Sequence, residues 1–353
     1  MLNREVEIYE NDVIKEVLNN INVEKNNLLK IEDLKTNFYV KGEKIQAVRG
    51  VNLNVKKGEV LGIVGESGSG KSVLMKSIMN LLPGGAVIES GKVLFNDIDI
   101  LDKGENVRGR EISMIFQDPM TSLNPLKKIG QHLIEVIVRT RGIKKNEAKE
   151  VAIEALREVG IQEPEKRINQ YPHEFSGGMR QRVLIAMAIA CKPKLLIADE
   201  PTTALDVTIQ AQIIQLLKDI KKSNDMSIIL ITHDLGVVAS ICDRVAVMYG
   251  GLIMEEGSID EIFYEAKHPY TKALLNSIPR NNGSEKERLR TIKGSAPSLL
   301  NPPKGCPFAD RCQHANKLCL NGLPDFKEFS DTHKARCFLI NWYKERREWK
   351  RNR

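Results

Sequence analysis

The sequence predicts an α/β protein organised around a central parallel sheet. Three short apolar runs, at 60–64, 194–198 and 227–231, have the length and composition of buried parallel strands. Segments with helical periodicity follow two of them, at 72–82 and 207–220. Parallel strands need such crossover helices, because each strand must start at the same edge of the sheet as the one before it. The alternation therefore predicts helices packed on a parallel sheet.

Other segments predict two additions to this core. Strand-like patterns at 29–34 and 45–55 come before the first parallel strand and indicate an antiparallel β subdomain. Two short strands are expected within 86–95, one on each side of Ser90-Gly91, and a buried strand is expected at 111–116. A helical subdomain is then expected over about 118–180, because helical patterns dominate that stretch.

The later segments complete the predicted order of elements. A helix at 178–190 is apolar on most faces and should be buried. Residues 243–249 and 252–256 are typical of a hairpin that turns at two glycines. Helical segments are expected at 258–265 and 270–278, and the chain beyond them is rich in Pro, Gly and Cys.

The 353 residues therefore divide into three predicted parts. Residues 1–28, rich in Asn, Glu and Lys, are expected to lie outside the core. Residues 29–257 form the α/β domain, and residues 258–353 form a small Cys-rich C-terminal extension. The basic end at 344–353 could touch anionic lipid or nucleic acid, although a solvated helix end is the preferred interpretation.

Composition narrows the class of protein. The net charge of +7 is modest for this length. No apolar run is long enough to cross a bilayer, and the acidic, polar N-terminus lacks the pattern of a secretory signal. We therefore expect an intracellular protein, which must dock on other chains if it works at a membrane.

Residues 65–72, Gly-Glu-Ser-Gly-Ser-Gly-Lys-Ser, match the phosphate-binding pattern GxxxxGK[ST] between a strand and a helix. The glycines let backbone N–H groups turn toward a phosphate, and the helix start adds the positive end of its dipole. Lys71 is expected to reach the β- and γ-phosphates of a nucleotide, and Ser72 to bind Mg²⁺. The predicted nucleotide contacts of this phosphate loop are Gly65, Ser67, Gly68, Ser69, Gly70, Lys71 and Ser72.

Two further stretches predict the chemistry. Asp199 directly follows the strand 194–198, where a carboxylate can bind Mg²⁺, and Glu200 can activate water as a general base. The signature segment, Phe175-Ser-Gly-Gly-Met-Arg-Gln-Arg182, opens an apolar helix with a second anion site. One nucleotide rarely needs two such sites, so this one is expected to close on the γ-phosphate bound by a second subunit. The alternative is that Ser176 acts only as an N-cap.

Taken together, these motifs resemble the ATPase subunit of an ABC transporter over about residues 29–257. The matching stretches are 65–72, 175–182, Leu195-Leu-Ile-Ala-Asp-Glu-Pro-Thr-Thr-Ala-Leu-Asp206 and Ile231-Thr-His-Asp234. The resemblance implies a P-loop NTPase fold of the ABC type, with a RecA-like core, an antiparallel β subdomain and a helical subdomain. It also implies binding of ATP and Mg²⁺ and hydrolysis of the ATP.

The resemblance assigns roles to individual residues. Gln117 resembles the glutamine that senses Mg²⁺ and the transmembrane partner, and His233 resembles the switch histidine at the γ-phosphate. Asp206 resembles an aspartate at the dimer seam, and either Phe38 or Tyr39 resembles the aromatic that stacks on adenine. In the signature segment, Ser176, Gly177 and Gly178 are kept, whereas Met179 stands where the family usually has glutamine.

Three other stretches resemble the dipeptide and oligopeptide importers: 116–125, 268–271 and 294–297. This similarity implies peptide import on the cytoplasmic face of the cell membrane, where the protein would be peripheral. The implied partners are a second ATPase subunit, expected to be a paralogue, two transmembrane permease subunits and an extracytoplasmic substrate-binding protein. A nickel chelate or glutathione remains an alternative cargo.

A DNA-repair ATPase is a weaker alternative, because no sustained heptads lie between Ser72 and Ser176. No nucleic-acid partner is therefore expected. A redox-responsive regulatory protein, with the cysteines as its functional part, is another minor alternative.

Four of the six cysteines gather near the C-terminus, at positions 306, 312, 319 and 337. A [4Fe–4S] cluster takes four thiolates at such wide spacing, and some peptide-importer ATPases carry one in this region. Zinc is the alternative, although its ligands usually come in close Cys pairs. Four small buried side chains without a metal are the third possibility. We expect the cluster, held by Cys306, Cys312, Cys319 and Cys337.

Overall fold

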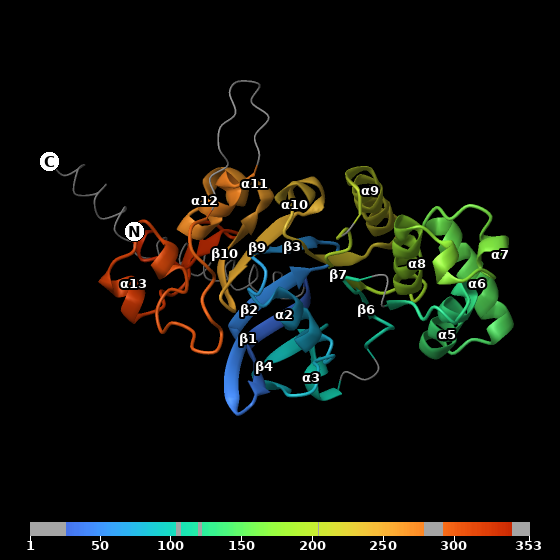
Figure 1. The fold of residues 1–353 in the computed structure, drawn as a ribbon, viewed down its shortest axis with the longest axis horizontal. Helices are drawn as coiled ribbons and strands as arrows, with labels where there is room; N and C mark the ends of the chain where they lie inside the picture. The colour runs from blue at the N-terminus through green and yellow to red at the C-terminus, as the bar shows by residue number, and fades with distance from the viewer. Residues whose placement is uncertain (1–25, 104–106, 119–121, 204, 279–291, 341–353) are drawn as a thin grey trace, which may run out of the picture.

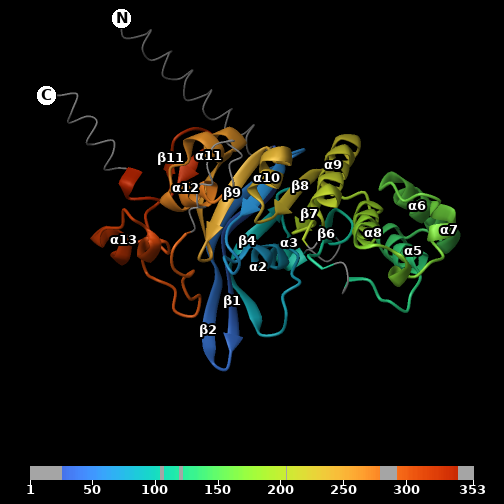
Figure 2. The same ribbon diagram turned by 45° about the horizontal axis from the view of Figure 1, so that its top comes forward.

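The computed structural model describes residues 26–103, 107–118, 122–203, 205–278 and 292–340. Figures 1 and 2 show two sheets near the centre of an elongated molecule. A group of helices lies at one end of it and the C-terminal segments lie at the other. Nearly all of the expected N-terminal extension and the whole basic segment 344–353 lie outside the described residues.

The first sheet is antiparallel, with the strand order β2-β1-β4-β5. Its strands are β1 (Asn27–Val40), β2 (Glu43–Lys56), β4 (Ala86–Phe95) and β5 (Ile98–Asp99). The prediction of two short strands within 86–95 was wrong, because β4 is continuous and pairs with β1 along its whole length. Register shifts on β1 around Lys35, the partner of Ser90, accommodate the Ser-Gly step without a turn.

The second sheet has the order β11-β12-β10-β9-β3-β8-β7-β6. Its strands are β3 (Val60–Val64), β6 (Ile112–Ile115), β7 (Leu195–Asp199), β8 (Ser227–Ile231), β9 (Arg244–Tyr249), β10 (Leu252–Ser258), β11 (Lys327–Glu328) and β12 (Lys334–Ala335). The five strands from β9 to β6 run parallel. This confirms the parallel arrangement predicted for β3, β7 and β8, and it adds β6 and β9 to that set. The hairpin of β9 and β10 is also confirmed.

The parallel strands read as continuous apolar runs because both faces of their sheet are covered. Alternate residues enter two separate hydrophobic clusters, since successive side chains of a strand point to opposite faces. On β3, Val60 and Val64 belong to one cluster, whereas Leu61 and Ile63 belong to the other. All five residues of β3 are buried, which fixes the position of the loop that follows it.

The α-helices are α2 (Lys71–Ile78), α3 (Ile100–Lys103), α5 (Ile129–Arg141), α6 (Lys145–Glu158), α7 (Pro164–Arg167), α8 (Gly177–Ile189), α9 (Val207–Asn224), α10 (Leu235–Ile241), α11 (Ile259–Glu265), α12 (Pro269–Asn276) and α13 (Lys317–Asn321). Helix α2 ends before its predicted limit of 82, because Asn80 has a φ of 48° and Pro83 follows. Helix α8 is buried on most faces, as its composition predicted. Among the described helices, none is long and apolar enough to cross a bilayer.

The C-terminal region (residues 259–340) is tied to the parallel sheet. Strand β12 pairs with the outer edge of β10, through Glu255 opposite Ala335 and Glu256 opposite Lys334. Figure 1 shows α11 and α12 beside β9 and β10, with α13 farther out, at the end of the molecule opposite α5, α6 and α7. The region therefore lies against the same sheet that carries the phosphate loop.

Candidate functional site

The phosphate loop joins β3 to α2, and two of its positions have room only for glycine. A Cβ atom on Gly65 would lie 2.1 Å from the backbone oxygen of Met248. One on Gly70 would lie 2.4 Å from the backbone oxygen of Ala47, and Gly70 also has a φ of 104°. The loop is thus pressed against β9 and β2, and its path is fixed before any ligand arrives.

Lys71 is folded into this loop. Its side chain is buried, and its Nζ donates to the backbone oxygens of Gly65 at 2.7 Å and Glu66 at 2.9 Å. Burial lowers the pKa of Lys71, while the carboxylates of Glu200 and Asp199 act in the opposite direction. A partly desolvated ammonium group of this kind favours a strongly anionic ligand.

Ser72 and Asp199 meet although 127 positions separate them. The Ser72 Oγ donates to Asp199 Oδ1 at 3.1 Å, because α2 begins beside the end of β7. Asp199 is buried, and burial raises its pKa while the hydrogen bond from Ser72 lowers it. A hydroxyl and a carboxylate side by side are ligands that suit Mg²⁺. These two residues could therefore hold the metal that the sequence predicts.

Glu200 lies at the centre of the remaining predicted catalytic groups. Gln117 Nε2 donates to Glu200 Oε2 at 3.1 Å, and His233 Nδ1 lies 3.6 Å from Glu200 Oε1. Glu200 also has a φ of 48°, a strained backbone of the kind found at functional sites. Thr203, whose hydroxyl donates to Glu200 Oε2 at 2.8 Å, was not predicted. Thr203 lies within the matched stretch 195–206, but an uncharged threonine gave no reason to predict a catalytic contact.

The signature segment has quite different surroundings. Ser176 and Gly177 are exposed, and the Ser176 Oγ accepts from the N–H of Met179 at 3.3 Å. Ser176 therefore caps α8, which does not decide whether it also contacts a nucleotide. Asp206 is exposed as well and caps α9 by accepting from the N–H of Ile209. Capping leaves the other backbone N–H groups at the start of α8 open to a ligand.

The two candidates for the adenine contact lie next to each other near the end of β1. Phe38 is half-buried and pairs with Ile45 and Ala86, whereas Tyr39 is 49% exposed. Adjacent strand residues face opposite sides of a sheet. Only one of the two aromatic rings can therefore stack on a given adenine. The structure does not select between Phe38 and Tyr39.

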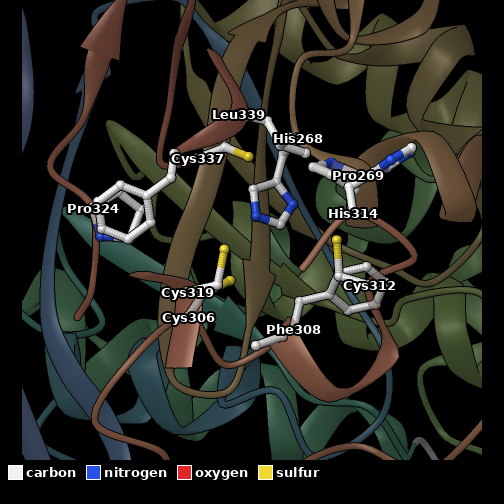
Figure 3. A pocket seen from close by; sticks show the side chains of 12 residues that line it. His268, Pro269, Cys306, Phe308, Cys312, His314, Cys319, Pro324, Cys337 and Leu339 are labelled. Carbon is white, nitrogen blue, oxygen red and sulfur yellow. The ribbon is translucent and has the colours of Figure 1, made fainter. Parts of the chain in front are cut away.

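The four C-terminal cysteines line one pocket, named here the thiol pocket. Figure 3 shows it, with the ring of His268 among the side chains that face it. Its polar or sulfur-bearing lining comprises Cys306, Cys312, Cys319, Cys337, His268 and His314. Burial raises the pKa of Cys306 to about 12 and that of Cys337 to about 11. In the described ranges, no three His, Cys, Asp or Glu side chains are close enough together to hold one metal ion.

Comparisons with known proteins place this geometry in a family. The model of the ABC transporter family matches residues 48–203, and the model named "Oligopeptide/dipeptide transporter, C-terminal region" matches 254–319. The fold is similar to MJ0796, described as a bacterial ABC transporter cassette, with a TM-score of 0.58 and 31% identity over 65% of this chain and 98% of that one. The protein is therefore an ABC ATPase, with the α/β fold and mixed sheets of that cassette.

The relatives define the family more narrowly. The oligopeptide transport ATP-binding protein OppD of Bacillus subtilis is 55% identical over 319 residues, which is 89% of each chain. The dipeptide transport ATP-binding protein DppD of the same organism is 50% identical over 88% of this chain and 94% of its own. OppD of Salmonella typhimurium is 50% identical over 89% of this chain and 94% of its own. The chain belongs to the ATP-binding subunits of oligopeptide and dipeptide ABC transporters.

Proposed function

We propose that this protein powers the import of oligopeptides or dipeptides by hydrolysing ATP on the cytoplasmic face of the cell membrane. The observation that carries the proposal is the meeting of Ser72, Asp199, Glu200 and Gln117 at the edge of the parallel sheet, beside the phosphate loop. They come from α2, from the end of β7 and from the segment after β6. This edge is where α/β sheets bind ligands.

Each group has a distinct task in the proposed reaction. Lys71 exchanges the carbonyl oxygens of its own loop for phosphate oxygens of ATP. Ser72 and Asp199 hold Mg²⁺, which supplies charge stabilisation for the transferred phosphoryl group. Glu200 accepts a proton from the attacking water. His233, next to Glu200, contacts the γ-phosphate.

The assembly around this site is also proposed. Ser176, Gly177 and Gly178 of a second ATPase subunit, expected to be a paralogue, close on the γ-phosphate, and Asp206 lies across the same seam. The exposure of Ser176 and Asp206 in a single chain supports this arrangement. Two permease subunits and an extracytoplasmic binding protein complete the transporter, with Gln117 near the permease contact. Nickel chelates and glutathione are the alternative cargoes.

The substitution Glu200→Gln tests the proposed chemistry in the assembled transporter. It keeps the side chain's size but removes the base, so ATP binding should remain while hydrolysis slows by about 10²–10⁴-fold. Glu150→Gln, at an exposed acid on α6, is the matched control and should hydrolyse ATP normally. Hydrolysis by the Glu200 variant at the wild-type rate would remove Glu200 as the base.

We also propose that the four cysteines of the thiol pocket hold an iron–sulfur cluster. A single zinc ion needs four sulfurs converging on one point, at about 2.3 Å from it. The described residues present no such group, yet all four thiols line the same space. Four thiols lining one space match the number of thiolates that a [4Fe–4S] cluster takes, and this shared lining is what supports the proposal. Such a centre supplies four bonds that tie together a region with little regular structure.

Anaerobic purification tests this second proposal. The wild-type protein should contain iron and absorb at about 400 nm. Cys319→Ser should lose both signals, whereas Cys242→Ser, at a buried cysteine outside the thiol pocket, should keep them. Zinc in place of iron would select the alternative metal, and wild-type protein without any metal would contradict the proposal.

A further inference from the structure

Two side chains of the C-terminal region contact the phosphate loop at Glu66. Arg311 makes a two-pronged ion pair with it: Nη1 donates to Glu66 Oε2 at 2.7 Å and Nη2 donates to Glu66 Oε1 at 3.0 Å. The two residues are 245 positions apart. This paired geometry is the strongest that arginine and a carboxylate can form. Glu66 is the second residue of the phosphate loop, so the contact acts directly on the proposed ATP site.

A second side chain from the same region holds the backbone of Glu66. The Tyr270 hydroxyl accepts a hydrogen bond from the Glu66 N–H at 2.9 Å. Tyr270 is fully buried and packs against the rings of Tyr249, at 4.4 Å between centroids, and Phe308, at 5.3 Å. It belongs to the stretch 268–271, to which the proposed reaction gives no task. Both the main chain and the side chain of Glu66 are thus fixed by the C-terminal region.

Arg311 is itself rigidly held. Its side chain is only 7% exposed, and it also donates to the Tyr249 hydroxyl at 2.8 Å and to the backbone oxygens of Lys293 and Ile292. Its guanidinium lies over the ring of Tyr249. The hydrogen bonds to Glu66 keep the pKa of Arg311 above its usual value. A fixed, permanently charged group therefore faces the phosphate loop.

The charge of Glu66 explains why such a group is needed. A carboxylate in a loop that binds a triphosphate repels its own ligand. Glu66 also lies within electrostatic range of Lys71, the cation that should contact the phosphates. An arginine that neutralises Glu66 leaves the charge of Lys71 free to act on the nucleotide.

We propose that Arg311 is a positioning residue for ATP: it neutralises Glu66 and, with Tyr270, fixes the start of the phosphate loop. The inference rests on the proposed function, because it assumes that ATP binds to residues 65–72. It makes the C-terminal region part of the nucleotide site. Arg311 directly precedes Cys312 of the thiol pocket, so the packing of that pocket reaches the phosphate loop through one residue.

Calorimetric titration of MgATP into the purified full chain tests the proposal through a double substitution. Arg311→Gln leaves Glu66 unneutralised and should weaken ATP binding by about tenfold. Glu66→Gln removes the repelling charge, so its affinity should equal or exceed that of the wild type. The double variant should return to within about twofold of Glu66→Gln, because the harmful charge is then absent.

Two further variants separate this proposal from loss of folding and from the proposed function. Arg336→Gln alters a half-buried arginine of the same region that lies 4.2 Å from the Phe326 ring, and it should bind ATP normally. Equal weakening in Arg311→Gln and in the double variant would overturn the electrostatic argument, as would normal binding by Arg311→Gln. Binding that is unaffected by Lys71→Ala would instead refute the phosphate loop as the ATP site.

Discussion

The phosphate loop and the signature segment are both glycine-rich starts of helices, yet they are built in opposite ways. In the phosphate loop, Lys71 is buried and bonded to its own loop, and Glu66 is held by Arg311 and Tyr270. In the signature segment, Ser176 is exposed, and its side chain accepts a hydrogen bond from the first turn of its own helix. The phosphate loop is completed by distant parts of one chain, whereas the signature segment is exposed, as the proposed contact with a second subunit requires.

We expect this difference to separate the binding of ATP from its hydrolysis. The phosphate loop has its shape and charges set before ATP arrives, so a single chain should bind the nucleotide. Ser176 and Asp206 are exposed, and in the proposed assembly they act on a nucleotide carried by a partner subunit. Substitutions at the two sites should therefore give different results in single-chain and assembled measurements.

The largest expected effect is that of Lys71→Ala on ATP binding. Removing the ammonium group takes away the only lysine of the loop and leaves the carboxylates of Asp199 and Glu200 facing the phosphates. Affinity of the single chain for MgATP should fall by at least about 10²-fold. Lys76→Ala, in the same helix, is the matched control and should change affinity little. Similar losses in both variants would mean that α2, not the loop, had been damaged.

Local patterns predicted much of the fold and of this site. The apolar runs of β3, β7 and β8, the loop between β3 and α2, and the hairpin of β9 and β10 all depend on residues close in sequence. For the same reason Asp199 and Glu200 could be located at the end of a strand. Ser72 and Asp199 were each predicted to bind Mg²⁺, and the hydrogen bond between them agrees with a shared site.

Features that depend on distant pairing were missed. Strand β4 is continuous because β1 pairs along it, which the Ser-Gly step within β4 could not reveal. The pairing of β12 with β10, and hence the union of the C-terminal region with the main sheet, had no periodic signal. No sign of the role of Arg311 was present in the sequence either. Its partner Glu66 lies 245 positions away, and neither residue belongs to a motif that predicts the ion pair.

A smaller effect is expected for Ser176→Asp, and only on hydrolysis. Aspartate is a good N-cap, so α8 should remain stable, but its charge would repel the γ-phosphate of ATP bound to the partner. ATP binding by the single chain should be unchanged, while hydrolysis by the assembled transporter should fall by about 10-fold to 10²-fold. Ser176→Asn keeps the cap without the charge and should lose less activity. Weaker ATP binding by the single Ser176→Asp chain would contradict the division between the two sites.

The smallest effect on ATP binding is expected at Glu255. This residue stabilises the C-terminal region but does not contact the phosphate loop in the described structure. This fully buried carboxylate accepts from the N–H groups of Lys267 and His268, and its Oε1 lies 2.8 Å from His333 Nε2. Burial by itself would raise its pKa, but the hydrogen bonds from His333 and these backbone groups outweigh it and lower the pKa. Because the folded value lies below the unfolded one, Glu255 stabilises the protein above about pH 4.5, and this contribution is lost as the pH falls further.

Thermal unfolding of Glu255→Gln measures this contribution. At neutral pH the variant should lose about 1–3 kcal/mol of unfolding free energy, and its stability should depend less on pH below about 4.5 than that of the wild type. Glu265→Gln, at a side chain that is 67% exposed, should behave as the wild type. ATP affinity of Glu255→Gln should change by less than about twofold, since Arg311 and Glu66 remain paired. A tenfold loss would instead mean that the whole C-terminal region, rather than Arg311, holds the phosphate loop.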